Sequence, residues 1–319
     1  MESEKLIQLR SSGPGLMGPF LEESMAPYRV LDENSQTSFR ILLVIGGKQK
    51  ANFFGHHIIA KSISLWQLSD TCLVLDSELH HSDGGLPRIL GGPTLGHHRY
   101  HLLNSDQETM CRMAYKLYSK VLSQFADLNM IFVQDMGGMA ATVEFLSRWT
   151  LWADAHQERV PMVLVQDVPV SLEELHFEMT IQLLAMLRGQ EPERQLSTMQ
   201  IKSLITKTFC FYVASSPAQL PQLFDLADKR AQGQADRGLQ LSAAHTKTLL
   251  QRGIAQFAKT PHQPLRFVHL SRKNCPVPVT IRKNVTSTIL VNKNHPGEVC
   301  HIIASALALD ALTAGGHCT

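Results

Sequence analysis

The sequence lacks several patterns that would place it in a familiar class of protein. None of its six cysteines forms a Cys-x-x-Cys pair, and isolated cysteines in apolar runs are typical of buried free thiols. No apolar run approaches the roughly 18 to 20 residues of a membrane span, and the N-terminus shows no basic segment followed by an apolar one. We therefore expect a cytoplasmic protein without a membrane span.

Hydrolase and metal motifs are also missing. No Gly-x-Ser-x-Gly elbow and no His-Glu-x-x-His pair occurs, although histidines gather between His56 and His101. Metal sites of this kind depend on a fixed spacing of their ligands. We therefore predict no metal site and assign no catalytic residue.

Acidic residues are absent from one long stretch of the chain. Residues 237–297 contain ten Lys or Arg and no Asp or Glu, although the net charge of the whole chain is only +2. Such asymmetry is typical of a surface for an anionic partner, or of a face that docks on an acidic part of the same protein. We favour docking and do not expect nucleic-acid binding, because the stretch lacks the interleaved aromatics that stack on bases.

What is present is an alternation of apolar runs and amphipathic segments in a chain that is 44% hydrophobic and 18% charged. Near-continuous apolar runs that alternate with helical patterns are typical of a parallel sheet covered on both faces. We predict strands at residues 39–45, 71–76, 129–135, 160–167 and 207–214, with short candidates at 265–270 and 287–291. We predict helices at residues 105–127, 139–156, 171–189, 217–231, 239–258 and 299–313.

These elements predict an α/β fold with a doubly wound, mostly parallel sheet and a C-terminal extension. Residues 1–37 carry Pro, Gly, Ser and acidic residues without periodicity, so we expect a flexible N-terminal arm. Residues 38–190 form the predicted α/β core. Residues 191–319 form a basic C-terminal part that we expect to pack on the same sheet.

The most informative segment is residues 39–54, FRILLVIGGKQKANFF. A buried strand, a pair of glycines and a segment that can begin a helix follow one another, as in a phosphate-binding loop (P-loop). A working P-loop reads Gly-x-x-x-x-Gly-Lys-Ser/Thr, with the Lys on the terminal phosphates and the hydroxyl on Mg²⁺. Aligned from Gly46, this chain has Ala51, Asn52 and Phe53 at the last three positions. The scaffold is therefore predicted to lack the hydrolytic chemistry.

Five residues are nevertheless candidates for nucleotide binding: Gly46, Gly47, Lys48, Lys50 and Asp76. Asp76 ends an apolar strand (LVLD), where nucleotide hydrolases place the acid that holds Mg²⁺. Lys48 or Lys50 would replace the missing lysine if GTP or ATP bound with Mg²⁺. The other interpretation is that both lysines are solvated charges on a turn.

Three predicted strands end in an aspartate, namely Asp76, Asp135 and Asp167. Ligands of parallel α/β sheets sit beyond the carboxyl ends of the strands. An aspartate at such a position also commonly caps the turn or helix that follows it. For each of the three we favour capping.

Several of these segments resemble a known family. The resemblance is carried by three segments: LLVIGGKQKANFF, LVLDSELHH and FVQDMGGMAATVEFLSRW. They resemble a degenerate, GTPase-like P-loop region that lies N-terminal to patatin-like phospholipase domains in large fungal multidomain proteins. The similarity covers roughly residues 39–190 and is clearest from Phe132 to Trp149. It implies a P-loop NTPase-like fold in a cytosolic protein, with Gly46 as the first P-loop glycine and Asp76 as the Walker-B acid. The patatin domain has no counterpart here, so no lipase activity is implied.

The leading functional hypothesis is a non-catalytic, pseudo-GTPase module that serves as a regulatory or protein-binding scaffold. Its partner would be another protein, and it would need no cofactor. One alternative is an atypical nucleotide-binding protein or NTPase that uses the lysines of the loop. The other is binding of an anionic partner through residues 237–297.

Overall fold

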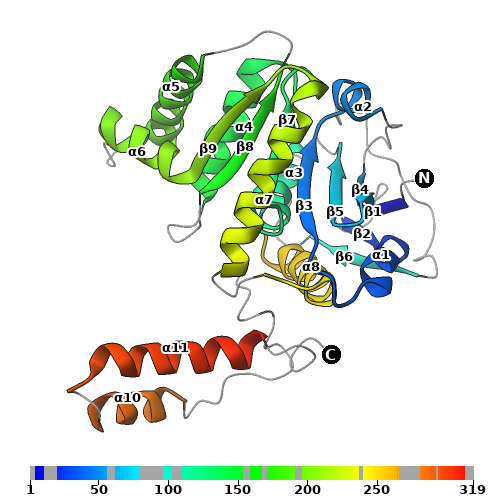
Figure 1. The fold of residues 1–319 in the computed structure, drawn as a ribbon. Coiled ribbons are helices and arrows are strands. Elements are labelled where there is room, and N and C mark those ends of the chain that lie inside the picture. The colour runs from blue at the N-terminus through cyan, green and yellow to red at the C-terminus, as the bar shows by residue number, and fades with distance from the viewer. Residues whose placement is uncertain are drawn as a thin grey trace.

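The computed structural model describes residues 4–10, 20–55, 62–78, 96–102, 110–153, 159–166, 171–190, 196–236, 240–263, 265, 270, 281–291 and 294–312. Its centre is a nine-stranded mixed sheet with the order β6-β2-β1-β4-β5-β3-β7-β8-β9 (Figure 1). The sheet has a parallel half, which contains the segments predicted as buried strands, and an antiparallel half.

The parallel half confirms the predicted α/β class. It consists of β5 (Cys72–Ser77), β3 (Arg40–Ile45), β7 (Leu128–Phe132), β8 (Val160–Val165) and β9 (Phe209–Ala214). Side chains of β3 alternate between two cores, because successive residues of a strand point to opposite faces. Ile41, Leu43 and Ile45 enter one core, whereas Leu42 and Val44 enter the other.

The antiparallel half corrects the expectation of a flexible arm over residues 1–37. It consists of β6 (His97–His101), β2 (Phe20–Ser24), β1 (Glu4–Arg10) and β4 (Ile63–Ser69), which pairs with β5. The arm segments lack a clear apolar period, but β1 and β2 are central strands of this half, and Leu6, Ile7, Leu9 and Leu21 are buried in the core. Cross-strand pairing therefore decides their structure.

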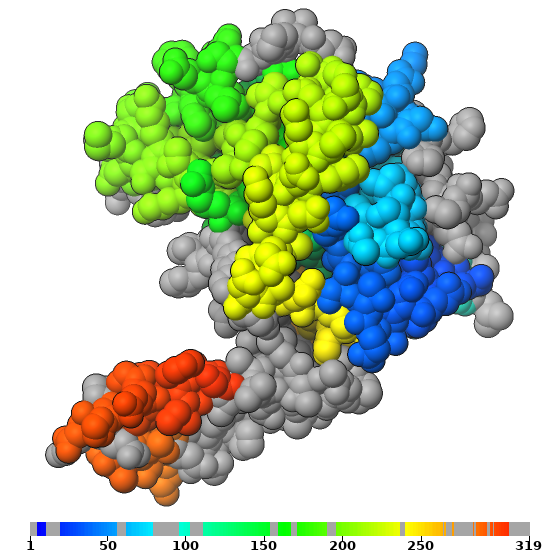
Figure 2. All heavy atoms as spheres, viewed as in Figure 1, coloured from blue at the N-terminus to red at the C-terminus, as the bar shows by residue number. Residues whose placement is uncertain are grey.

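Helices cover both faces of the sheet. One face packs against α3 (Met110–Lys120), α4 (Met139–Trp152), α5 (Leu172–Gln190), α6 (Thr198–Thr208) and α8 (Ala243–Lys259). The other face packs against α2 (Lys48–Phe54) and α7 (Leu220–Asp236), which runs across the front of the molecule in yellow-green (Figure 2). Shorter helical segments are η1 (Ala26–Tyr28), α1 (Arg29–Glu33), η2 (Leu122–Gln124) and η3 (Pro217–Gln219).

Part of residues 191–319 lies on the sheet. β9 extends the parallel half, and α7 and α8 pack on the sheet. Beyond α8, α10 (Ile281–Val291) and α11 (Pro296–Leu312) contact each other and lie to one side of the sheet (Figures 1 and 2). The strand predicted over residues 287–291 is wrong, because this segment is the end of α10.

Other differences concern boundaries. The helix predicted over residues 105–127 is α3, and its expected start lies outside the described residues. Residues 266–269 of the strand predicted over 265–270 also lie outside the described residues. Within the described residues, no helix has the length and apolar character required to cross a membrane.

Candidate functional site

The predicted P-loop segment forms a tight turn from β3 into α2. The Gly46 amide donates to the Ser77 carbonyl at 3.0 Å, which ties the turn to the end of β5. A Cβ added at Gly46 would lie 2.8 Å from the Phe132 Cβ and 2.9 Å from Asp135 Oδ2. Glycine is therefore required here by the close approach of the loop after β7.

The backbone amides of this turn are bound by the Asp135 carboxylate. Its Oδ2 accepts from Gly47 N at 2.6 Å and from Lys50 N at 2.9 Å, and its Oδ1 accepts from Gln49 N at 2.9 Å. In a phosphate-binding loop, amides of this kind point at the ligand. In this protein the amides are bound by a side chain of the neighbouring loop.

The loop after β7 holds Asp135 in place. The Met136 amide donates to the Phe132 carbonyl at 3.1 Å, and the Gly138 amide donates to the Val133 carbonyl at 2.9 Å. Gly137 and Gly138 have φ values of +95° and +92°, in the region that favours glycine. The Gly-Gly pair thus closes the turn and then begins α4 at Met139.

Lys50 is buried beneath the turn and does not face solvent. Its side chain forms an ion pair with Asp76, and its Nζ donates to the Ser77 carbonyl at 3.3 Å. The residue is only 3% exposed. Since a buried charge needs a partner, Asp76 serves to neutralise Lys50, and the interpretation of Lys50 as a solvated surface charge is wrong.

The carboxylate of Glu78 adds to this cluster of charges. Burial raises the pKa of Glu78, Lys50 opposes that rise, and the negative charges of Asp76 and Asp135 reinforce it. A Cβ added at Gly47 would lie 3.0 Å from Glu78 Oε1. Three carboxyl groups and one buried ammonium group therefore surround the turn, and this environment opposes the entry of another anion.

A cavity of about 420 Å³ opens beside the turn, at the carboxyl ends of β3, β7, β8 and β9. It is lined by Lys48, Gln49, Asn52, Phe53, Gln134, Asp135, Val165, Ser215 and Pro217. The chain leaves β3 toward β5 and leaves β7 toward β8 on the other side. Ligand sites of open α/β sheets lie at such switch points.

The structure brings four of the five predicted residues together: Gly46, Gly47, Lys50 and Asp76. Lys48 is exposed and lines the cavity instead. Sequence reasoning missed the role of Asp135, because we expected an aspartate at a strand end to cap its own following turn. Asp167 lies outside the described residues. Within the described part of the chain, no group of three His, Cys, Asp or Glu side chains is placed to hold a metal ion.

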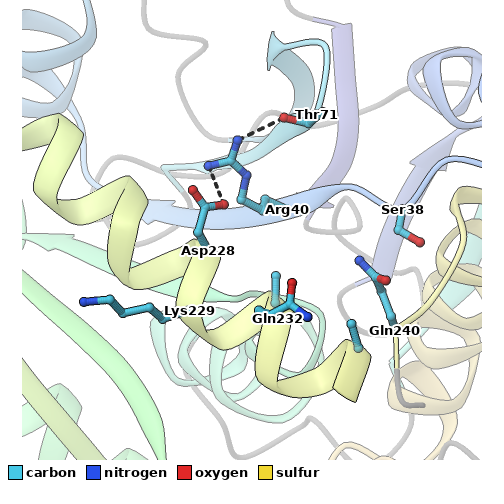
Figure 3. A pocket seen from close by; sticks show the side chains of 9 residues that line it. Ser38, Arg40, Thr71, Asp228, Lys229, Gln232 and Gln240 are labelled. Carbon is cyan, nitrogen blue, oxygen red and sulfur yellow. Dashed lines mark hydrogen bonds and ion pairs between the residues drawn. The ribbon is translucent and has the colours of Figure 1, made fainter. Parts of the chain in front are cut away.

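A second cavity, of about 520 Å³, lies at the opposite end of β3 (Figure 3). It is lined by Ser38, Arg40, Thr71, Asp228, Lys229, Ala231, Gln232, Ala235 and Gln240. The Arg40 guanidinium lies between Asp228 Oδ1, at 2.8 Å, and Thr71 Oγ1, at 2.9 Å (Figure 3). This cavity contains none of the predicted site residues, and its arginine is already neutralised.

Near this end of the sheet, Asp127 is buried at the start of β7. Its Oδ2 accepts from Ile41 N at 2.8 Å. Burial raises the pKa of Asp127 to about 6, against the opposing effects of that hydrogen bond and of Arg230 and Arg40. Asp127 therefore connects β3 to β7 through this hydrogen bond. Because burial disfavours its charged form, its contribution to the free energy of unfolding depends on pH.

The acid-free stretch makes contacts within the chain where it is described. Lys247 Nζ of α8 pairs with Asp32 of α1 at 2.6 Å, and Arg252 NH1 donates to the Leu270 carbonyl at 2.7 Å. The first contact agrees with the docking interpretation, whereas the second joins two residues of the acid-free stretch itself. Lys259 and Lys283 are exposed.

No protein-family model matches this sequence, and no curated protein matches it either.

Proposed function

We propose that this chain is a non-catalytic scaffold of pseudo-GTPase type, which acts through a protein partner in the cytoplasm. The observation that carries the proposal is the occupation of the loop amides by the Asp135 carboxylate. The resemblance to the degenerate P-loop region of fungal patatin-associated proteins supports the same assignment.

A phosphate that entered this turn would have to displace Asp135. Hydrogen bonds to charged groups each contribute about 1.5 to 3 kcal/mol net, and Asp135 accepts three of them. The displaced carboxylate would then lie beside the phosphate and repel it. Lys50 offers no compensation, because its charge is committed to Asp76.

The test is a titration of the full chain with fluorescent GTP and ATP analogues, with and without Mg²⁺. We expect no saturable binding up to millimolar nucleotide and no release of phosphate. A known GTPase titrated in parallel is the positive control for the fluorescent analogues. Saturable binding that requires Mg²⁺ would overturn the scaffold assignment.

One observation favours the alternative of an atypical nucleotide-binding protein. Lys48 is exposed and lines the cavity of about 420 Å³ at the switch point of the sheet. If nucleotide binds there, Lys48→Ala weakens it strongly while Lys202→Ala, which changes an exposed lysine on α6, leaves it unchanged. Equal affinity of the two variants would exclude Lys48 from the site.

The anionic-partner alternative makes a separate prediction. Binding of anionic lipid vesicles or RNA through residues 237–297 would weaken steeply as salt is raised, because counterion release drives it. Binding that is absent or insensitive to salt would exclude this alternative.

A further inference from the structure

The two edges of the sheet differ in how they are protected. β6, at one edge, reads HHRYH, and its Arg99 pairs with Glu22. Charged and polar side chains of this kind discourage the addition of another strand. β9, at the other edge, reads FCFYVA, with no charge and no proline, and it pairs with β8 without a shift in register.

The backbone direction of β9 follows from one hydrogen bond. The Gln166 amide donates to the Ala214 carbonyl at 3.0 Å, so the amide and carbonyl of Ala214 face β8. In a parallel ladder these directions alternate along the strand. Phe211 and Val213 therefore direct their amides and carbonyls away from β8, toward the open edge.

The neighbouring outward groups are already bound. The Phe209 amide donates to the Ile205 carbonyl, and the Phe209 carbonyl accepts from the Arg159 guanidinium at 3.0 Å. At the other end, the Ser215 amide donates to Gln219 Oε1 at 2.7 Å. Within the described residues, the open part of the edge is thus limited to Phe211 and Val213.

We propose that two copies of this chain associate through their β9 strands, which pair antiparallel and join the two sheets. A second copy fits because the strand carries no charge that would repel itself and because the open groups are self-complementary. In a two-fold interface the same patch faces itself. Phe211 then exchanges two hydrogen bonds with the partner's Val213, and Val213 does so with the partner's Phe211.

This register is set by the bound neighbours. A shift that centred the pair on Phe211 would require the amide and carbonyl of Phe209, and a shift that centred it on Val213 would require the Ser215 amide. Both are occupied. The remaining register places Tyr212 opposite the partner's Tyr212, and it matches Phe211 with Val213, an aromatic and β-branched pair of the kind that stabilises sheets.

Exposed apolar surface close to β9 supports an interface larger than the strand itself. His176 of α5 packs on Phe211 with ring centroids 5.6 Å apart, and the next residue, Phe177, is 58% exposed. Specific interfaces generally bury about 1,200 to 2,000 Å² of surface in total. The paired strand residues of the two copies would bury less than this. We therefore expect a reversible, concentration-dependent dimer. The inference does not depend on whether the P-loop-like turn binds nucleotide.

Sedimentation equilibrium of the full chain, from about 1 to 200 μM, tests the proposal. The expected result is a monomer–dimer equilibrium for the wild type. Val213→Pro removes the outward amide without touching the β8 ladder and should raise the dissociation constant at least tenfold. Val213→Thr keeps the amide and the branched shape and should leave the dimer unchanged. A wild type that is monomeric throughout, or a dimer insensitive to Val213→Pro, overturns the proposal.

A cross-linking variant keeps the test independent of the folding of the proline variant. In the proposed register, the Cα atoms of the two Tyr212 residues are about 4.5 Å apart, within disulfide range. Tyr212→Cys, made with Cys210→Ser and with Cys300→Ser to remove the exposed free thiol, should form a covalent dimer under mild oxidation. Ser215→Cys in the same background is the control, since it does not lie on the two-fold axis. Equal cross-linking of the two variants, or none for Tyr212→Cys, contradicts the register.

Discussion

The Asp135 carboxylate accepts a hydrogen bond from the Gly47 amide, 88 positions earlier in the chain, at 2.6 Å. The bond joins the loops that follow two neighbouring strands, β3 and β7. Together with the bonds from Gln49 N and Lys50 N, it provides the amides at the start of α2 with an acceptor from within the protein. The structural role of Asp135 is therefore the first property to test.

Replacement of Asp135 should destabilise the fold in a graded manner. Asp135→Ala leaves three amides without their acceptor, and we expect a loss of about 3 to 5 kcal/mol in the free energy of unfolding. Asp135→Asn keeps one oxygen acceptor and should lose less. Urea denaturation measures both, with Asp225→Ala, at an exposed position of α7, as the control. A change for Asp135→Ala no larger than for the control would refute the role.

The Lys50–Asp76 ion pair should show strong coupling. Lys50→Met leaves the carboxylate of Asp76 without its partner, and breaking a buried pair in this way typically costs about 3 to 5 kcal/mol. The double variant Lys50→Met with Asp76→Asn removes both charges and should be more stable than Lys50→Met alone. A double-mutant cycle by urea denaturation measures the coupling, and additive losses would contradict it.

Alanine at two glycines should have opposite effects. Gly46→Ala brings a Cβ within 3.0 Å of Phe132 and Asp135, so we expect a loss of about 1 to 3 kcal/mol from overpacking. Gly233→Ala lies in α7 with nothing within 4 Å of the new Cβ, and should gain about 0.5 to 1 kcal/mol. Thermal unfolding compares the two variants, and equal shifts of Tm would show that the turn after β3 is not tightly packed.

Asp127 should make stability depend on pH. Its pKa is about 6 in the folded protein, above the ordinary value of 3.8, so the folded state binds more protons than the unfolded state between these values. The contribution of Asp127 is therefore fully present below about pH 4 and is lost as the pH rises through 6. Asp127→Asn lacks this loss, and its stability relative to the wild type should increase from pH 4 to pH 7. Urea denaturation across this range measures the difference, and a constant difference would contradict the raised pKa.

Local pattern alone predicted the parallel half of the fold. Runs such as residues 41–45 are apolar throughout because both faces of a covered parallel strand are buried, and this property is visible within a few residues. The glycines after β3 and the replacement of the P-loop residues by Asn52 and Phe53 are equally local. The same is true of the helical periodicity of α4, α5 and α8.

Tertiary structure decided what those residues do. The partners of Gly47 and Lys50 are Asp135 and Asp76, which lie far along the chain, and no periodicity specifies which aspartate reaches which loop. β1 and β2 likewise acquire their structure from cross-strand pairing in the sheet. The sequence thus determined that a strand, a turn and a helix follow one another. Only the assembled sheet placed a carboxylate against the amides of the turn, because burial and long-range contacts depend on the whole fold.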